Sequence, residues 1–110
     1  MGSTGKLESL LVLDGTLEAL LGCRIGIVEA SRLIAASRVT LCQESNPLFI
    51  PFVGIDSETD QFPLGEVREL WAPDALVRYD QERELAEQHF RSFAMQSANA
   101  LLAWVRAQEF

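Results

Sequence analysis

Three carboxylates that alternate along one short segment are the residues best placed to do chemistry in this chain. They are Asp56, Glu58 and Asp60. If the backbone is extended there, all three side chains point to one side, where a hard cation finds the oxygen ligands it prefers. The calcium-loop pattern fails, because it needs Gly at its sixth position and an acid at its twelfth, and Gln61 and Val67 stand there. We therefore expect no metal and no cofactor.

The same carboxylates have three simpler uses that the sequence leaves open. Asp56 or Ser57 caps a local turn, the carboxylates pair with arginines of the same chain, or they form an acidic patch that binds a partner. The arginines available for internal ion pairs are Arg24, Arg32, Arg38 and Arg68.

The other candidates for catalysis lack the neighbours that each reaction needs. His89 is the only histidine, and Ala86 stands three residues before it in place of the Glu of a di-iron bundle. Neither Cys23 nor Cys42 lies in a nucleophile signature, and the chain contains no Gly-x-Ser-x-Gly and no phosphate-binding glycine loop. We expect both thiols to be buried or half-buried, as free cysteines commonly are. The sequence favours a protein that is not an enzyme.

The charge of the chain is concentrated around the alternating carboxylates. Residues 56–89 hold ten acidic residues and three arginines, whereas the rest of the chain holds six acidic and six basic residues. The whole formal net charge of −7 therefore lies in one stretch. Such a field repels the phosphates of nucleic acids and attracts basic proteins. We expect no nucleic-acid binding and a basic protein partner.

The main functional hypothesis is a non-enzymatic protein-binding module that acts through the acidic surface of residues 56–89. The residues predicted to bind the partner are Asp56, Glu58, Asp60, Glu66, Arg68 and Trp71. The alternative is a small-molecule or metal-binding protein, or a small enzyme, in which the loop carboxylates Asp56, Glu58 and Asp60 act together with Arg68 and Trp71.

The first half of the chain is predicted to form two helical segments and a hairpin. Residues 7–13 begin a helix that the Asp-Gly-Thr sequence at 14–16 interrupts, and residues 25–37 form the next helix. Residues 38–42 alternate and are β-prone, and residues 48–55 form an apolar run, so the two runs pair as one small hairpin. The expected class is therefore α+β and helix-dominated, with an all-α fold as the alternative.

A long C-terminal helix is the clearest structural feature of the sequence. No Gly or Pro follows Pro73, and one apolar stripe recurs at spacings near three and four. The stripe comprises Leu76, Tyr79, Ala86, Phe90, Phe93, Ser97, Leu101 and Trp104. A helix of this length, about 50 Å at 1.5 Å per residue, is longer than a small domain. We therefore predict a homodimer in which a second copy covers part of this helix.

Size and composition bound the remaining expectations. A chain of 110 residues with 48% hydrophobic residues suits one globular domain, which we place at residues 7–110. Residues 1–6 look like a tag or a disordered start. No apolar run approaches the roughly 20 residues that span a bilayer, and no signal peptide is apparent. The expected location is the cytoplasm, with no membrane partner.

Several strings of the sequence resemble a family of small, uncharacterised bacterial proteins over roughly residues 17–105. The strings are Ile27–Arg32, Phe52–Asp60, Pro63–Arg68, Trp71 and Ala75–Leu76. The most specific part is Asp-Ser-Glu-Thr-Asp followed by Pro-x-Gly-x-x-Arg-x-x-Trp. Family members usually have His where this chain has Gln61, so no role of that His carries over. The resemblance implies a bacterial protein similar in size and acidity to immunity proteins and other accessory proteins of mobile gene clusters.

Overall fold

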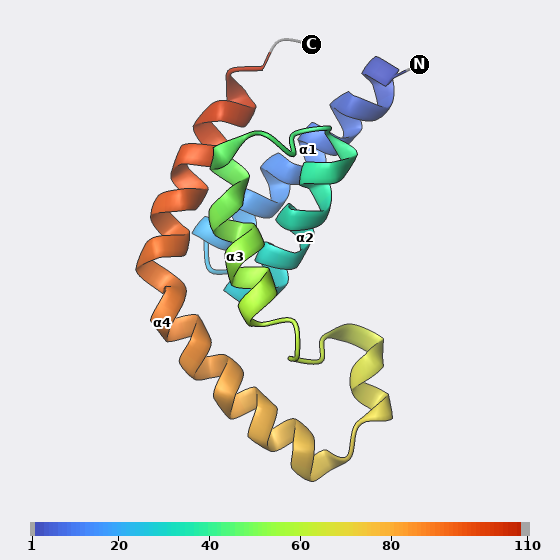
Figure 1. Ribbon diagram of the computed structural model, residues 1–110, viewed down its shortest axis with the longest axis vertical. Helices are drawn as coiled ribbons and strands as arrows, with labels where there is room; N and C mark the ends of the chain where they lie inside the picture. Colours follow the sequence, from blue (N-terminus) through green and yellow to red (C-terminus); the bar gives the residue numbers. More distant parts are fainter. Residues whose placement is uncertain (1, 109–110) are drawn as a thin grey trace.

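Helices make up all the regular structure of the described residues, which are 2–108 of a computed structural model. The elements are α1 (Gly2–Leu21), α2 (Ile27–Thr40), the 3-10 helix η1 (Pro47–Phe49), α3 (Ile50–Glu58), the 3-10 helix η2 (Gly65–Leu70) and α4 (Pro73–Arg106). Figure 1 shows α1, α2 and α3 packed beside the second half of α4, while η2 and the first half of α4 extend beyond them. Among these residues no strand occurs, so the expected α+β class is wrong and the all-α alternative is correct.

Helix α1 is continuous from Gly2, within the segment predicted to be a tag, to Leu21. Its buried face is made of four leucines at spacings of three and four: Leu10, Leu13, Leu17 and Leu20. The interruption expected at residues 14–16 does not occur, because Gly15 costs a helix only about 1 kcal/mol and each buried leucine contributes about 2 kcal/mol. Thr16 lies within this helix, and its hydroxyl donates to the Val12 carbonyl at 2.9 Å.

The first predicted strand of the hairpin, residues 38–42, is the last turn of α2 and its cap. The helical spacing of Ile27, Ala30 and Ile34 continues seven residues on to Leu41, and all four side chains are buried. Val39, by contrast, is exposed. Five alternating residues are too few to define a strand when a longer helical pattern includes them.

The second predicted strand, residues 48–55, is η1 and most of α3. Phe52 and Ile55 form the buried face of α3, and the same helical spacing continues to the buried C-cap residue Thr59. Pro51 lies in the first turn of this helix, where the missing N–H has no helical acceptor. The same proline that would weaken a strand therefore suits the start of a helix.

Both cysteines lie on the surface, contrary to the expectation of buried thiols. Each follows the end of a helix and has a left-handed backbone, with φ 58° at Cys23 and 56° at Cys42. After α2 the Cys42 N–H donates to the Val39 carbonyl at 3.0 Å, and the next N–H reaches the Arg38 carbonyl at 2.8 Å. This is the Schellman arrangement, in which the left-handed position is usually glycine. The cysteines thus end two helices, at some backbone cost.

The inner face of the second half of α4 is narrow and consists of Ala94, Ala98, Leu101 and Val105. The predicted apolar stripe lies to one side of this face, so that only Leu101 belongs to both and Phe93 is half exposed. Arg106 joins α4 to α1 through ion pairs to Asp14 and Glu18. No helix of the described residues is long and apolar enough to cross a membrane.

Replacing Cys42→Gly should raise the free energy of unfolding by about 0.5–1 kcal/mol, because glycine adopts positive φ without a steric penalty. Cys42→Ala is the matched control, since it removes the thiol and keeps the penalty. Chemical denaturation of the three proteins measures the difference. Equal stability of the glycine and alanine variants would contradict the role assigned to this position.

Candidate functional site

The acidic stretch includes an extension of the molecule that has no core of its own. We call residues 64–86 the arm; it contains η2 and the first half of α4. None of its residues is buried, whereas Phe62 and Pro63 before it and Glu87 after it are. Figure 1 shows the arm turning back on itself beyond the ends of α2 and α3. The packed part, which we call the body, comprises α1, α2, η1, α3 and the rest of α4.

One ion pair connects the two sides of the arm. The Arg68 guanidinium donates to both carboxylate oxygens of Asp80 at 2.7 Å, and Arg83 lies 3.6 Å from the same carboxylate. The hydrogen bond from Arg68 lowers the pKa of Asp80, and it raises the pKa of Arg68. Arg68 also donates to the Pro63 carbonyl at 3.3 Å, so a single side chain ties η2 to both α4 and the loop before it.

Three aromatic rings supplement this ion pair. Trp71 meets Tyr79 edge to face, with ring centroids 5.0 Å apart, and Phe62 meets the same tyrosine at 6.3 Å. Arg78 lies over the Tyr79 ring at 5.2 Å. Edge-to-face pairs of this kind stabilise by about 1 kcal/mol each. The arm is therefore held closed by side chains around Tyr79 and Asp80.

The three alternating carboxylates do not form a common site. Asp56 and Glu58 lie in the last turns of α3, where a spacing of two residues points side chains to different sides. Asp56 lies 3.5 Å from Arg32, whose guanidinium also donates to the carbonyls of Thr59 and Phe62 at 2.7 Å. Internal pairing, one of the uses left open above, thus explains Asp56. The extended backbone that would align the three carboxylates is not present, because α3 continues to Glu58. The described residues contain no cluster of three or more His, Cys, Asp or Glu side chains that could hold a metal ion.

The six residues predicted to bind a partner divide into two groups. Glu58, Asp60 and Glu66 are exposed and form no ion pair with any described residue. The other three, Asp56, Arg68 and Trp71, are half-buried in the contacts given above and hold the arm and the end of α3 in place.

A residue that the sequence analysis missed fastens the C-terminal end of the acidic stretch to the body. Glu87 is 8% exposed, and its carboxylate accepts hydrogen bonds from the Ile27 and Val28 N–H groups at 2.6 and 2.9 Å. It caps the start of α2, where Gly26 has no side chain to do so. A Cβ at Gly26 would lie 3.0 Å from the Glu87 carboxylate. The absence of Ser, Thr, Asp or Asn before Ile27 was the available signal.

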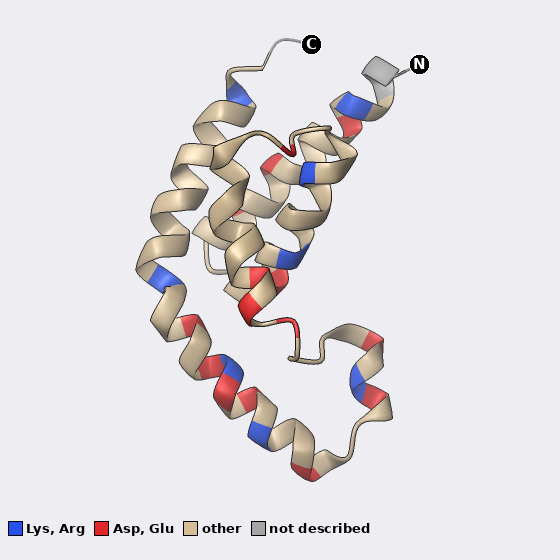
Figure 2. Ribbon diagram, viewed as in Figure 1, with Lys and Arg blue, Asp and Glu red and all other residues tan. Residues whose placement is uncertain are grey.

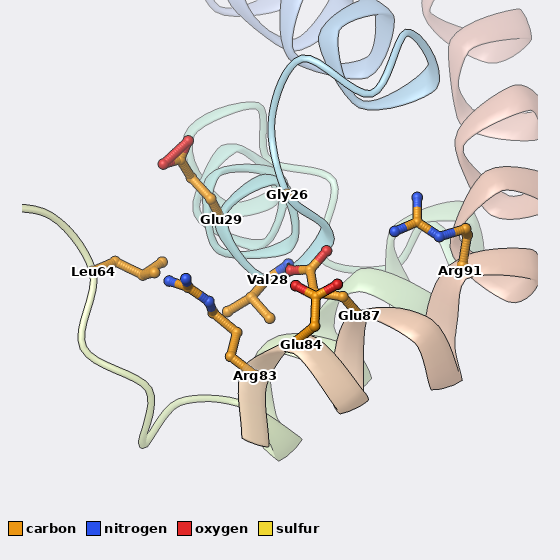
Figure 3. Close-up of a pocket in the computed structure, with 8 residues that line it drawn as sticks. All are labelled: Gly26, Val28, Glu29, Leu64, Arg83, Glu84, Glu87 and Arg91. Carbon is orange, nitrogen blue, oxygen red and sulfur yellow. The ribbon is translucent and has the colours of Figure 1, made fainter. Parts of the chain in front are cut away.

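A shallow hollow of about 260 Å³ lies beside Glu87, between the start of α2 and α4. Figure 3 shows Glu84 and Glu87 between Arg83 and Arg91, with Glu29 opposite on α2. The residues that line the hollow are Gly26, Val28, Glu29, Leu64, Arg83, Glu84, Glu87 and Arg91. The lining has no Ser, Cys or His. The only histidine, His89, is exposed and lies against Phe90 instead.

Exposed carboxylates and exposed large apolar residues occur together on the arm and the adjoining end of α3. Figure 2 shows acidic residues gathered in this half of the molecule. The exposed carboxylates without an ion pair to a described residue are Glu58, Asp60, Glu66, Glu69, Asp74, Glu82 and Glu84. The exposed apolar residues of the arm are Val67, Leu70, Val77 and Leu85, of which Leu70 is 84% exposed. This combination is suited to contact with another protein.

Comparisons with protein-family models, with curated proteins and with solved structures found no match to this chain. The bacterial family resemblance drawn from the sequence strings therefore stays a prediction.

Replacing Glu87→Ala should destabilise the protein by about 2 kcal/mol, because two N–H groups at the start of α2 lose their acceptor. Glu87→Gln should cost less, since one oxygen still accepts. Glu84→Gln, one turn earlier and exposed, is the control and should change stability by less than about 0.5 kcal/mol. Thermal and urea unfolding measure all three; a Glu87→Ala protein as stable as the control would refute the cap.

The pair of Arg68 and Asp80 should persist to acidic pH, because the pKa of Asp80 is lower in the folded protein than in the unfolded chain. Its stabilisation is full above about pH 4 and is lost as the pH falls through the lowered value. The indole NMR signal of Trp71 reports the arm. Wild type and Asp80→Asn should differ above pH 4 and converge only as the pH falls through the lowered pKa of Asp80. Identical titrations of the two proteins would contradict the pairing.

Proposed function

We propose that this protein is a non-enzymatic protein-binding module whose arm, with the adjoining end of α3, contacts a basic protein partner. The observation that carries this proposal is the set of seven exposed carboxylates that share the surface with four exposed apolar side chains. Internal ion pairs account for the carboxylates that are half-buried and leave these seven without a described partner. They are therefore free to meet a cationic surface.

The two kinds of side chain have different tasks in such a contact. Concentrated negative charge steers a basic partner toward the arm and discourages acidic competitors, including nucleic acids. Charges at the rim of an interface add little affinity in themselves, and buried apolar anchors supply most of it. Leu70 is the best candidate anchor because it protrudes most. Association should therefore weaken with salt, while the lifetime of the complex depends on Leu70.

Immunity-type inhibitors are the first class of protein to test. The sequence strings resemble a family of small bacterial proteins, and that family is similar to immunity proteins in size and acidity. A second copy of the chain is a further proposed partner. The homodimer predicted through the C-terminal helix would cover Val77, Leu85 and Phe93, which are the large apolar residues most exposed on α4.

The alternative of a ligand site or small enzyme at Asp56, Glu58 and Asp60 with Arg68 and Trp71 has less support. Three of these five side chains already have partners within the protein. Asp56 pairs with Arg32, Arg68 pairs with Asp80, and Trp71 packs on Tyr79. The hollow beside Glu87 is lined by none of the five.

The proposal is tested by replacing two glutamates with lysine either on the arm or on the body, so that both variants have the same net charge. Glu66→Lys with Glu69→Lys changes the net charge from −7 to −3, and so does the control pair Glu8→Lys with Glu44→Lys on the body. Proteins that the wild type retains from an extract of the source organism at low salt are identified, purified and titrated by calorimetry.

The arm pair should weaken binding about tenfold or more and reduce its salt dependence, whereas the body pair should leave the affinity nearly unchanged. Leu70→Ala should shorten the lifetime of the complex at any salt concentration. Equal losses in both charge pairs would indicate attraction to net charge alone and would refute a binding surface on the arm, as would failure to retain any protein.

A further inference from the structure

We infer that the arm opens and closes as a unit while the body stays folded, with Arg68 and Asp80 as its latch. The opening is a property of this chain alone. Its significance for regulation rests on the proposed function, because only the closed arm holds the carboxylates of η2 in a set position relative to those of α4.

The first observation is where burial stops along the chain. The buried apolar side chains lie in the body and at Phe62, and residues 64–86 contribute none. Opening the arm therefore exposes no fully buried side chain of the arm itself; it uncovers the half-buried faces of Trp71 and Tyr79 and the side of Phe62 that meets Tyr79. Segments with few buried contacts open at much lower free energy than the global unfolding of a protein.

The second observation is the nature of the contacts across the arm. Within the described residues, no backbone hydrogen bond joins η2 to α4. The ties are instead the two 2.7 Å bonds from Arg68 to Asp80 and the edge contacts of Tyr79 with Trp71 and Phe62. Because they converge on two neighbouring residues of α4, their loss is expected to be cooperative. Breaking the latch frees η2 as a whole.

The third observation is the weakness of the first half of α4 as an isolated helix. From Pro73 to Ala86 it has 14 residues, about the length at which a helix is marginal in water. Its N-cap, Ala72, makes no side-chain hydrogen bond. Without η2 against it, this half should fray from Pro73 toward the body.

Both ends of the moving unit are defined by fixed points. On one side Phe62 and Pro63 are buried, and Arg32 binds the Phe62 carbonyl at 2.7 Å. On the other side Glu87 is fastened to the start of α2. Gly65, with φ 65°, lies just inside the first fixed point and has a backbone conformation open to few other residues. Opening is thus confined to residues 64–86.

A partner that binds the closed arm would shift the population toward it, and a partner that needs the underside of Trp71 and Tyr79 would do the opposite. The pair of Arg68 and Asp80 holds η2, which carries Glu66 and Glu69, against the acidic first half of α4, so negative charge is most concentrated in the closed state. We therefore assign partner binding to the closed arm, with latch strength setting the fraction of molecules ready to bind.

Hydrogen exchange of the full chain, followed by mass spectrometry without any partner, tests the latch. In the wild type, amides of the arm should exchange at least about tenfold faster than those of residues 94–105, yet slower than an unstructured peptide. Asp80→Asn should accelerate exchange several-fold across the arm and leave the body unchanged. Glu82→Gln, with the same charge change on an exposed side chain, should leave both unchanged.

Three results would overturn the inference. They are arm amides that exchange as slowly as the body, arm amides that exchange as fast as free peptide in the wild type, and equal effects of Asp80→Asn and Glu82→Gln. Because exchange needs no partner, these results leave the proposed binding function untouched. Conversely, a latched arm that retains no protein from an extract would refute the binding function alone.

Discussion

The carboxylate of Glu87 connects the two parts of this molecule. Its hydrogen bonds to the N–H groups of Ile27 and Val28 replace the side-chain cap that the start of α2 lacks, and they place a negative charge at the positive end of that helix. Because Glu87 lies at the midpoint of α4, the same contact sets where this helix touches the body. After Glu87, α4 contributes Ala94, Ala98, Leu101 and Val105 to the core, whereas no residue of α4 before it is buried.

The buried apolar side chains are concentrated in the body, and the arm contributes none. The body holds the leucines of α1, the isoleucines of α2 and the phenylalanines around α3, so it carries the hydrophobic stabilisation. The arm is ordered by an ion pair and three rings, which can be broken at small cost. A surface that must adapt to a partner is commonly drawn from such a low-stability region. The concentration of negative charge there would oppose tighter packing, because the carboxylates repel one another.

The sequence indicated which stretch holds the candidate site. It did not show which of the residues there are exposed and which make contacts within the fold. Charge counting identified the stretch that holds the excess carboxylates, since net charge is additive along the chain. Asp56, Arg68 and Trp71 belong to the same stretch but serve the fold, as their partners Arg32, Asp80 and Tyr79 show. Those pairings depend on how helices meet, which a linear pattern does not contain. The exposed apolar side chain of Leu70 was likewise not singled out.

The sequence by itself determined the helical character, the length of α4 from Pro73 and the acidity of one half, because these follow from local spacing and composition. It misassigned residues 38–42 and 48–55, where short apolar runs are compatible with strand or helix until neighbours bury one face. Only the tertiary structure decided that Glu87 caps α2 and that Arg68 closes the arm. Both contacts join residues far apart or on separate elements, and their geometry arises only when the helices pack.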